Sequence, residues 1–354
     1  MAATSPRAEF LFDNLDRCCI HAAAGFGDVP PDSSSTTVCR LYFAHGSLDD
    51  FLTRYRGDTQ QLAARQTSAE ARRPGIELTG LAPPGDGRKG KLGFEIRAGW
   101  MEGALQMRFP ETLQSSLGLH FIDHSRRDMP QLSPLPKQPA WDRDEQTGEI
   151  RYTCQTSEGV EFGCRARPYE EAIYLEFSVT NNTTEPIHGV SPQMCLSMAP
   201  SADFNRQHDL PGTFAWFDGS WANLATTTPT PAEKGRVPWL QILTRSAGEY
   251  RGPRDNPDGW WFVDQKADYG IIARQSRDQE HLLAIAWQGA RALSTNTRIP
   301  CLHAGPSRPA SLKPGEKAVW RGKIYLMAND PESLLVRYNG DRGVWPYQEA
   351  SRSP

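Results

Sequence analysis

Residues 172–180 alternate between apolar and polar side chains along their whole length. Ile173, Leu175, Phe177 and Val179 occupy every second position, and the positions after them hold Tyr, Glu, Ser and Thr. Successive side chains of an extended chain point to opposite sides, so this pattern predicts a β-strand with one buried and one solvated face. Strands of this kind are typical of antiparallel sheets, whereas strands of parallel sheets are usually buried on both faces.

The flanking segments extend the pattern. Residues 149–155 and 160–167 are strand-like runs separated by Thr156-Ser157-Glu158-Gly159, which predicts a β-hairpin. Further strand-like runs follow at residues 187–197, 269–275 and 282–287. We therefore expect an all-β fold: a large antiparallel β-sandwich with short helices and long loops.

A short stretch of sequence occurs twice. Residues 19–58 and 301–341 share Cys-x-His near their start and Arg-Tyr-x-Gly-Asp near their end. In the second copy residues 318–327 have a strand pattern, and Asp330 followed by Pro331 is a helix-start signal. The repeated unit is predicted to be a turn, a strand and a short helix that closes a module.

This duplication determines the expected domain organisation. Nothing resembling residues 76–300 precedes the first copy, so residues 1–58 are expected to be a partial repeat of the closing element. Residues 59–90 are expected to be a linker, and residues 91–345 the main β-sandwich domain. Residues 1–58 could also dock against another chain and support a homo-oligomer.

The composition disfavours several functional classes. Lys and Arg total 39 against 42 Asp and Glu, and this balance gives no electrostatic footprint for nucleic acid or an anionic membrane. No apolar run approaches the roughly 20 residues of a membrane span. Seven irregularly spaced cysteines and the lack of a visible secretory signal favour a cytoplasmic protein with reduced thiols. Motifs of serine hydrolases, nucleotide-binding proteins and zincins are missing, and we expect neither an organic cofactor nor a metal.

At residues 159–163 and 175–181 the chain resembles the galactose-mutarotase-like (aldose-epimerase-like) β-supersandwich superfamily. In that superfamily a hairpin is followed by an alternating strand that ends in a Thr-Asn turn, and a Pro opens the next strand. The similarity covers roughly residues 90–330 and is closest over residues 149–197. It implies a carbohydrate ligand, because members are epimerases, certain lyases and accessory domains of glycosidases. In the epimerases a His acts as general acid and a Glu as general base, but no segment here reproduces the local sequence of that pair.

The first group of candidate site residues lies on the run 160–167. Glu161, Arg165 and Arg167 share one face of this predicted strand. A carboxylate beside two guanidinium groups suits a hydroxyl-rich or anionic ligand, since Arg can hold a carboxylate with two hydrogen bonds. The alternative is a solvated face with cross-strand ion pairs.

His120 and His124 form the second group. On a strand they would share a face but lie about 13 Å apart, which is too far to bind one metal. Asp123 or Asp128 could orient one of them for acid–base chemistry. The alternative is that both are ordinary polar histidines.

The third group lies in residues 203–261, which read as a long loop region rich in aromatic residues. Arg206 and His208 lie close in sequence to Trp216 and Trp221. Sugars stack on aromatic rings and need fixed polar partners, so this mixture favours sugar recognition. The alternative is that the tryptophans are core residues. Trp287 is a further candidate for substrate contact.

Cys301 and His303 mirror Cys19 and His21 of the first copy. Cys-x-His can be half of a metal site, but the sequence does not reveal another half. A buried histidine that supports the fold is the favoured interpretation.

Together these residues indicate a carbohydrate-active protein. We expect a sugar or uronate epimerase, lyase or hydrolase in which His208 or His120 donates a proton and Glu161 accepts one. Arg165 or Arg167 would hold the substrate. The alternative is a non-catalytic carbohydrate-binding or structural module of a larger assembly.

Overall fold

The structure of the 354-residue chain is a computed structural model. The residues it describes are 75–81, 92–120, 139–205, 210, 212–227, 239–247, 260–296, 299–305 and 310–344, together with Ser47 and the short strands β1 (Ala2–Thr4), β2 (Ala8–Asn14), β3 (Cys19–Ala24) and β4 (Arg40–Tyr42). They belong to two compact units, Met1–Arg72 and Arg73–Pro354. In the first unit β1 pairs with β4 and β2 with β3, both antiparallel.

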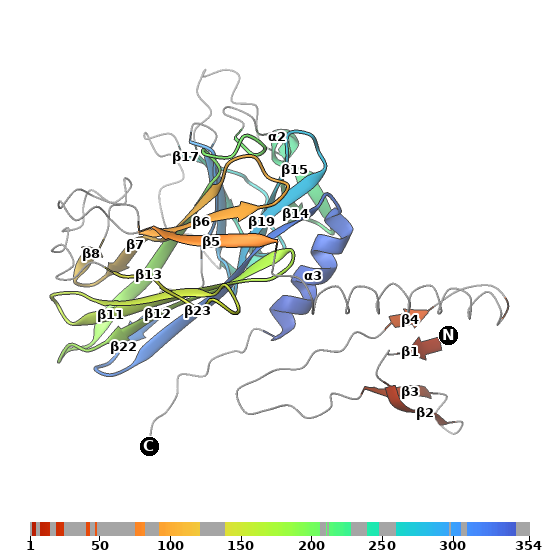
Figure 1. Ribbon diagram of the computed structural model, residues 1–354, viewed down its shortest axis with the longest axis horizontal. Coiled ribbons are helices and arrows are strands. Elements are labelled where there is room, and N and C mark those ends of the chain that lie inside the picture. Colours follow the sequence, from red (N-terminus) through yellow and green to blue (C-terminus); the bar gives the residue numbers. More distant parts are fainter. Residues whose placement is uncertain are drawn as a thin grey trace. The chain divides into compact units, whose positions relative to one another are not determined.

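Two sheets make up the second unit (Figure 1). The nine-stranded sheet has the order β15 (Ser220–Asn223), β14 (Thr213–Phe217), β18 (Ile271–Gln275), β19 (His281–Trp287), β23 (Lys317–Ala328), β12 (Ala172–Asn181), β11 (Val160–Pro168), β10 (Ile150–Gln155) and β9 (Asp142–Arg143). The ten-stranded sheet has the order β17 (Trp260–Phe262), β16 (Trp239–Leu243), β20 (Ala292–Asn296), β21 (Cys301–Gly305), β13 (Ile187–Ser197), β7 (Leu105–Ser115), β6 (Gly93–Ala98) and β5 (Ile76–Leu81), while β8 (Gly118–His120) pairs with β7 and β22 (Ala310–Leu312) with β13.

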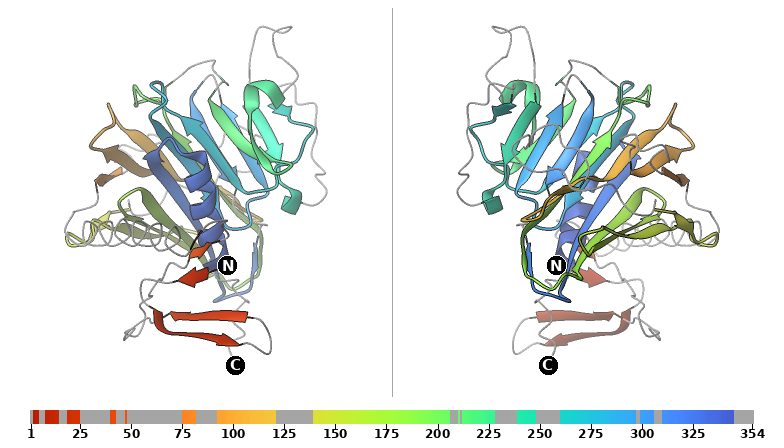
Figure 2. Two further views of the ribbon diagram at one scale, coloured as in Figure 1. Left: turned by 90° about the vertical axis from the view of Figure 1, so that its right-hand side faces the viewer. Right: turned by 90° about the vertical axis from the view of Figure 1, so that its left-hand side faces the viewer.

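Strand pairs in both sheets are antiparallel apart from β16 and β17, which are parallel. The helical segments described are α2 (Leu224–Thr227), the 3₁₀ turn Arg245–Ala247 and α3 (Pro331–Val344). The side views in Figure 2 show the sheets as separate layers. The expectation of an all-β sandwich is therefore confirmed.

The core fills the space between the two sheets. Phe94 and Phe109 from the ten-stranded sheet and Phe177 and Trp287 from the nine-stranded sheet are fully buried. Phe109 contacts both partners across the interface, with ring centroids 5.8 Å from Phe177 and 5.9 Å from Trp287. Burying a side chain of this size contributes roughly 1.5–3 kcal/mol, so these aromatic contacts hold the layers together.

The strands that alternation predicts are present. In β12 every second side chain is buried, in the phase that the sequence indicated. The predicted hairpin is β10 and β11, joined by a turn in which Gly159 has a φ of +91°. Only glycine adopts that backbone conformation readily.

The outer face of the nine-stranded sheet is covered by α3. Leu334 and Tyr338 of the helix pack against Ala284 and Ala286 of β19. This contact buries β19 on both faces. The helix begins as predicted, because Asp330 accepts hydrogen bonds at its carboxylate from the backbone N–H and the hydroxyl of Ser333.

Two segments differ from their sequence interpretation. Residues 76–81, inside the predicted linker 59–90, form β5 and pair with β6. The region 203–261 holds β14, β15, β16 and the start of β17. Strands β14 to β17 are short and lie within a region rich in Pro, Gly and Asn. Five residues or fewer are paired in each of these four strands, so their sequences show too little alternation to be recognised.

Candidate functional site

The outer face of the ten-stranded sheet carries a group of buried polar side chains. Strand register places Arg108 of β7 opposite Cys195 of β13, and Ser294 of β20 opposite His303 of β21. We call the following residues the polar cluster: Arg108, Glu111, Thr112, Gln193, Cys195, Cys301 and His303. Arg108 and Gln193 are partly exposed and the other five are buried.

Glu111 enters this cluster through an irregularity in β7. Thr112 pairs with Gln193 and Arg108 pairs with Cys195. Between these two pairs β13 has one residue, whereas β7 has three, of which Glu111 is the last. The Glu111 carboxylate accepts a hydrogen bond from Arg108 Nη1 at 3.1 Å on one oxygen and from Gln193 Nε2 at 3.0 Å on the other. A buried carboxylate is tolerated when it is paired in this way.

His303 lies next to Glu111, on the neighbouring strand β21. Its Nδ1 is 2.9 Å from the carbonyl oxygen of Met194 and 3.9 Å from Glu111 Oε2. A carbonyl oxygen can only accept, so Nδ1 carries a proton and donates it. Burial opposes the charged imidazole, but Cys195 and Glu111 outweigh burial and raise the pKa of His303 to about 9.

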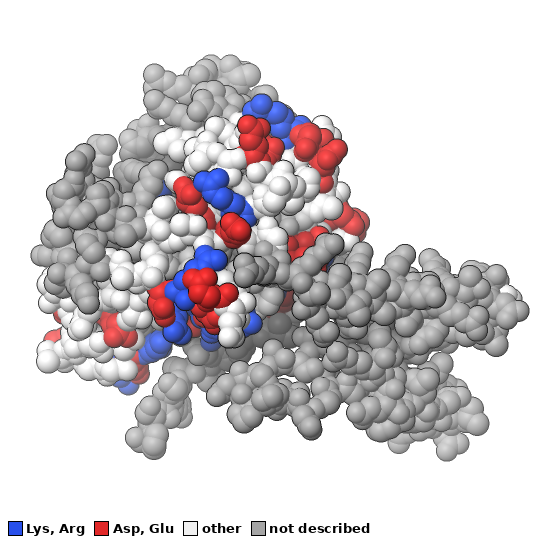
Figure 3. Space-filling model, in the orientation of Figure 1, with Lys and Arg blue, Asp and Glu red and all other residues white. Residues whose placement is uncertain are grey.

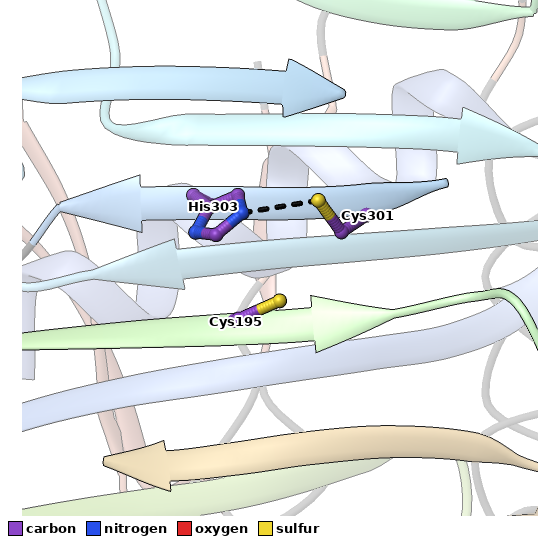
Figure 4. A group of neighbouring side chains, drawn as sticks. All are labelled: Cys195, Cys301 and His303. Atoms are coloured by element: carbon purple, nitrogen blue, oxygen red, sulfur yellow. Dashed lines mark hydrogen bonds between the residues drawn. The ribbon is translucent and has the colours of Figure 1, made fainter. Parts of the chain in front are cut away.

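The other ring nitrogen of His303 faces two thiols. His303 Nε2 is 3.1 Å from Cys301 Sγ, and the Cys195 side chain points toward this pair from β13 (Figure 4). Hydrogen bonding to Cys301, together with burial, raises the pKa of the Cys195 thiol well above its ordinary range. Both nitrogens of His303 thus have partners inside the protein.

Two polar atoms of the cluster lack a partner. No hydrogen-bonding atom in the described part of the chain reaches Arg108 Nε or Thr112 Oγ1. Buried polar groups are usually paired, so each unpaired atom calls for an explanation. Both atoms lie on the strand that supplies Glu111, and Arg108 keeps a quarter of its side chain exposed. Neither atom is accessible to solvent in this structure, so a ligand that presents hydroxyl or carboxylate oxygens would reach them only after neighbouring side chains move.

The residues proposed from the run 160–167 lie on the other sheet. Glu161, Arg165 and Arg167 face outward from β11, and Arg165 pairs with Glu149 at 2.8 Å. Arg167 lies over the ring of Tyr169, 5.6 Å from its centroid. Acidic and basic residues are interspersed over the described surface seen in Figure 3.

Trp216 and Trp221 lie near one edge of the same sheet. Their rings meet edge to face, 5.4 Å apart, and Trp221 Nε1 donates a hydrogen bond to the carbonyl of Pro331 at the start of α3. Four strands separate β14 from β11 and five separate β15 from β11, so Trp216 is about 24 Å and Trp221 about 29 Å from Glu161 at ~4.8 Å per strand. The structure therefore does not bring these two predicted groups together.

The remaining candidates fall in three places. Trp287 has no exposed surface and belongs to the core. Arg206 and His208 lie outside the described residues, as do His124, Asp123 and Asp128. His120 is described only by its backbone, which pairs with Leu113 at the end of β7, two residues after Glu111.

The sequence interpretation missed Arg108, Glu111, Gln193 and Cys195. One signal was available, because Gln106 and Arg108 are polar positions between the apolar residues 105, 107 and 109. Glu111 reaches the cluster because of the irregularity in β7, and Cys195 reaches it because β13 pairs with a strand that is distant in sequence. Neither feature can be read from the local sequence.

No family model and no curated protein matches the chain. Among solved structures it is similar to a putative aldose 1-epimerase from Escherichia coli K12, with 9% identity, a TM-score of 0.36, and coverage of 71% of this chain and 99% of the other. A galactose mutarotase-like protein from Clostridium acetobutylicum has 10% identity, a TM-score of 0.34, and coverage of 72% and 79%.

A third similar structure is an alpha-N-acetylgalactosaminidase from Bifidobacterium bifidum, with 12% identity, a TM-score of 0.40, and coverage of 77% of this chain and 38% of the other. Among the described residues, no helix has the length and apolar character needed to cross a membrane. Structures of the galactose-mutarotase-like and aldose-epimerase kind, which the sequence resembles, are thus among those similar to this chain.

Proposed function

We propose that this protein is carbohydrate-active and acts on a sugar or uronate at the polar cluster. The reaction is an epimerisation, an elimination or a hydrolysis that proceeds by acid–base chemistry. The observation that carries the proposal is Glu111: a buried carboxylate held by Arg108 and Gln193, beside two polar atoms that have no partner in the described chain. The sequence resemblance described above supports a carbohydrate as the ligand.

Glu111 is the proposed proton acceptor. Its two oxygens are fixed by separate donors, so the carboxylate is oriented before a ligand arrives. Such prior orientation favours proton transfer, because the group need not reorganise during the reaction. His303 supports Glu111 from behind, 3.9 Å away.

Arg108 and Thr112 are the proposed ligand contacts. Arg108 uses Nη1 for Glu111, and its Nε, which is buried in this structure, would pair with a hydroxyl or carboxylate oxygen once neighbouring side chains move. Thr112 Oγ1 can donate to or accept from a sugar hydroxyl. Binding would satisfy both atoms, whose desolvation otherwise costs roughly 1–3 kcal/mol each.

For the proton donor, the two histidines named from the sequence remain proposals. The backbone of His120 pairs with Leu113, whose side chain is buried in the core, so this pairing does not itself place His120 on the face of Glu111. His208, the other donor candidate, lies outside the described residues. The sequence suggested Glu161 as the carboxylate that accepts the proton. We propose Glu111 instead, because two polar atoms without a partner in the described chain lie beside it.

Proton NMR of the purified protein with mono- and oligosaccharides, including uronates, tests this function. We expect altered anomeric exchange, new reducing ends or vinylic protons, and a loss of turnover of 100-fold or more in Glu111→Gln. Glu161→Gln is the matched control and should behave like the wild type. Loss of turnover in Glu161→Gln alone would overturn the assignment to the polar cluster.

The rival function is a non-catalytic carbohydrate-binding module. Saturation transfer to a sugar without any turnover would establish it, provided that Arg108→Ala abolishes the transfer. No transfer and no turnover across the panel would refute both functions.

A further inference from the structure

Cysteines occur in two chemically different environments in the described part of this chain. Cys154 and Cys164 are buried among the apolar residues between the sheets. Cys195 and Cys301 are equally buried, but they lie on the outer face with the polar cluster and outside the apolar core. Together with His303 they form one of the groups of possible metal ligands found among the described residues. A thiol on a polar face, next to an imidazole, does not serve the packing role of the core cysteines.

Three ligand atoms converge at this point. The two Sγ atoms and one ring nitrogen of His303 all lie within 4.8 Å of one another. Zinc bonds of about 2.3 Å to sulfur and about 2.0 Å to nitrogen, arranged tetrahedrally, require separations of about 3.5–3.8 Å between ligand atoms. His303 Nε2 and Cys301 Sγ are 3.1 Å apart, so side-chain shifts of a few tenths of an ångström would bring these two atoms to the separation that zinc requires.

The sheet fixes the three side chains by backbone pairing. Cys301 and His303 are two residues apart on β21 and so face the same way, and β13 brings Cys195 alongside through the pairs Leu196–Leu302 and Ser197–Cys301. Ligands held on paired strands are placed more accurately than ligands on loops.

The surroundings of His303 match those of a metal-binding imidazole. Its Nδ1 donates to the carbonyl of Met194, with the Glu111 carboxylate behind, so Nε2 is the nitrogen directed at the thiols (Figure 4). Histidine ligands typically donate their second N–H to a carbonyl or carboxylate, which fixes the tautomer.

We propose that Cys195 Sγ, Cys301 Sγ and His303 Nε2 bind a single zinc-class divalent ion, with a fourth position left for an exogenous ligand. Sulfur and imidazole donors select this class of metal over magnesium and calcium. On binding, both thiols release their protons to solvent as thiolates, and the protonated His303 releases its Nε2 proton and binds in its neutral form. The inference is independent of the proposed sugar chemistry.

Cobalt(II) serves as the spectroscopic probe. The full-length protein, reduced and stripped with a chelator, is titrated with Co²⁺ under anaerobic conditions and then with Zn²⁺. We expect one equivalent of cobalt to give thiolate-to-metal charge-transfer absorption and tetrahedral ligand-field bands, both abolished by zinc. Absence of thiolate charge transfer in the wild type would overturn the proposal.

Variants locate the site. Cys195→Ser and His303→Gln should weaken Co²⁺ binding by 100-fold or more, while Cys164→Ser, a buried cysteine of the core, should bind as the wild type does. A variant with Cys18, Cys19 and Cys39 replaced by Ser excludes those thiols and should also retain binding. Unchanged binding in Cys195→Ser would refute the assignment.

X-ray absorption on the zinc-loaded wild type keeps the test independent of variant folding. Two sulfur ligands at about 2.3 Å and one imidazole nitrogen at about 2.0 Å are expected. A shell of nitrogen and oxygen alone would overturn the proposal. Neither measurement uses a sugar, so its outcome is separate from that of the proposed function.

Discussion

Tyr152 connects the core to the polar cluster through one hydrogen bond. Its hydroxyl donates to the carbonyl of Phe109 at 2.6 Å in a fully buried setting, two residues before Glu111. Tyr152→Phe keeps the ring and therefore its edge contacts with Trp141 and Phe162. The substitution removes the hydroxyl, which also interacts with the Cys164 thiol, and leaves the buried Phe109 carbonyl without this donor, which costs about 1–3 kcal/mol. With a urea m-value of about 3 kcal/mol/M, the unfolding midpoint should fall by roughly 0.3–1 M.

Tyr174→Phe is the matched control, because Tyr174 also loses one hydroxyl but on the outer face. That hydroxyl donates to Glu176 and accepts from Arg321 on a partly exposed surface. We expect its midpoint to change by less than about 0.2 M, because polar contacts near solvent contribute little. Both variants are compared by urea unfolding followed with circular dichroism. Equal shifts in the two variants would refute the reasoning that the buried Phe109 carbonyl depends on Tyr152.

Three further predictions follow from the fold. Phe177→Ala should lower the free energy of unfolding by about 3–5 kcal/mol, since it opens a cavity between the sheets; a loss below 1 kcal/mol in a urea titration would contradict the core described here. Asp330→Ala should cost about 1 kcal/mol at pH 7 through loss of the helix cap, and Asp330→Asn much less. Hydrogen bonding from Ser333 lowers the pKa of Asp330. The cap therefore stabilises the fold at pH values above the ordinary pKa of Asp, and this stabilisation is lost as the pH falls through the lowered pKa. A loss of stability in Asp330→Ala that does not become smaller in acid would refute this. Deleting residues 1–72 should leave a folded remainder, because those residues form a separate compact unit; aggregation in size-exclusion chromatography would show instead that they are needed.

The fold could be predicted because its evidence is local. The alternation in residues 172–180 depends on which face of one strand is buried, and β12 has that burial pattern. The helix start at Asp330 and Pro331 is likewise encoded within four residues. In contrast, β5 has only six residues, and the turn signal Pro74-Gly75 directly before it was not enough to distinguish it from the preceding segment. Its pairing with β6 decides its structure.

The candidate site could not be predicted because its geometry is non-local. His303 donates to a carbonyl 109 positions away, and Gln193 reaches Glu111 across 82 positions. The irregularity in β7 also changes which residues face outward, so a period of two counted along the sequence misplaces Glu111. A Cys-x-His motif was visible, but its partner Cys195 is supplied by β13.

The two outer faces of the sandwich differ in how their charges are compensated. On the nine-stranded sheet, basic and acidic groups pair with each other, as in Arg321 with Glu176 and Lys323 with Asp341, and α3 packs against β19. On the ten-stranded sheet, Arg108 and Thr112 keep polar atoms that have no partner in the described part of the chain, although their strand is buried. Unpaired polar groups destabilise a folded chain unless something binds them, so retaining them beside Glu111 favours the ten-stranded sheet as the face that a ligand occupies.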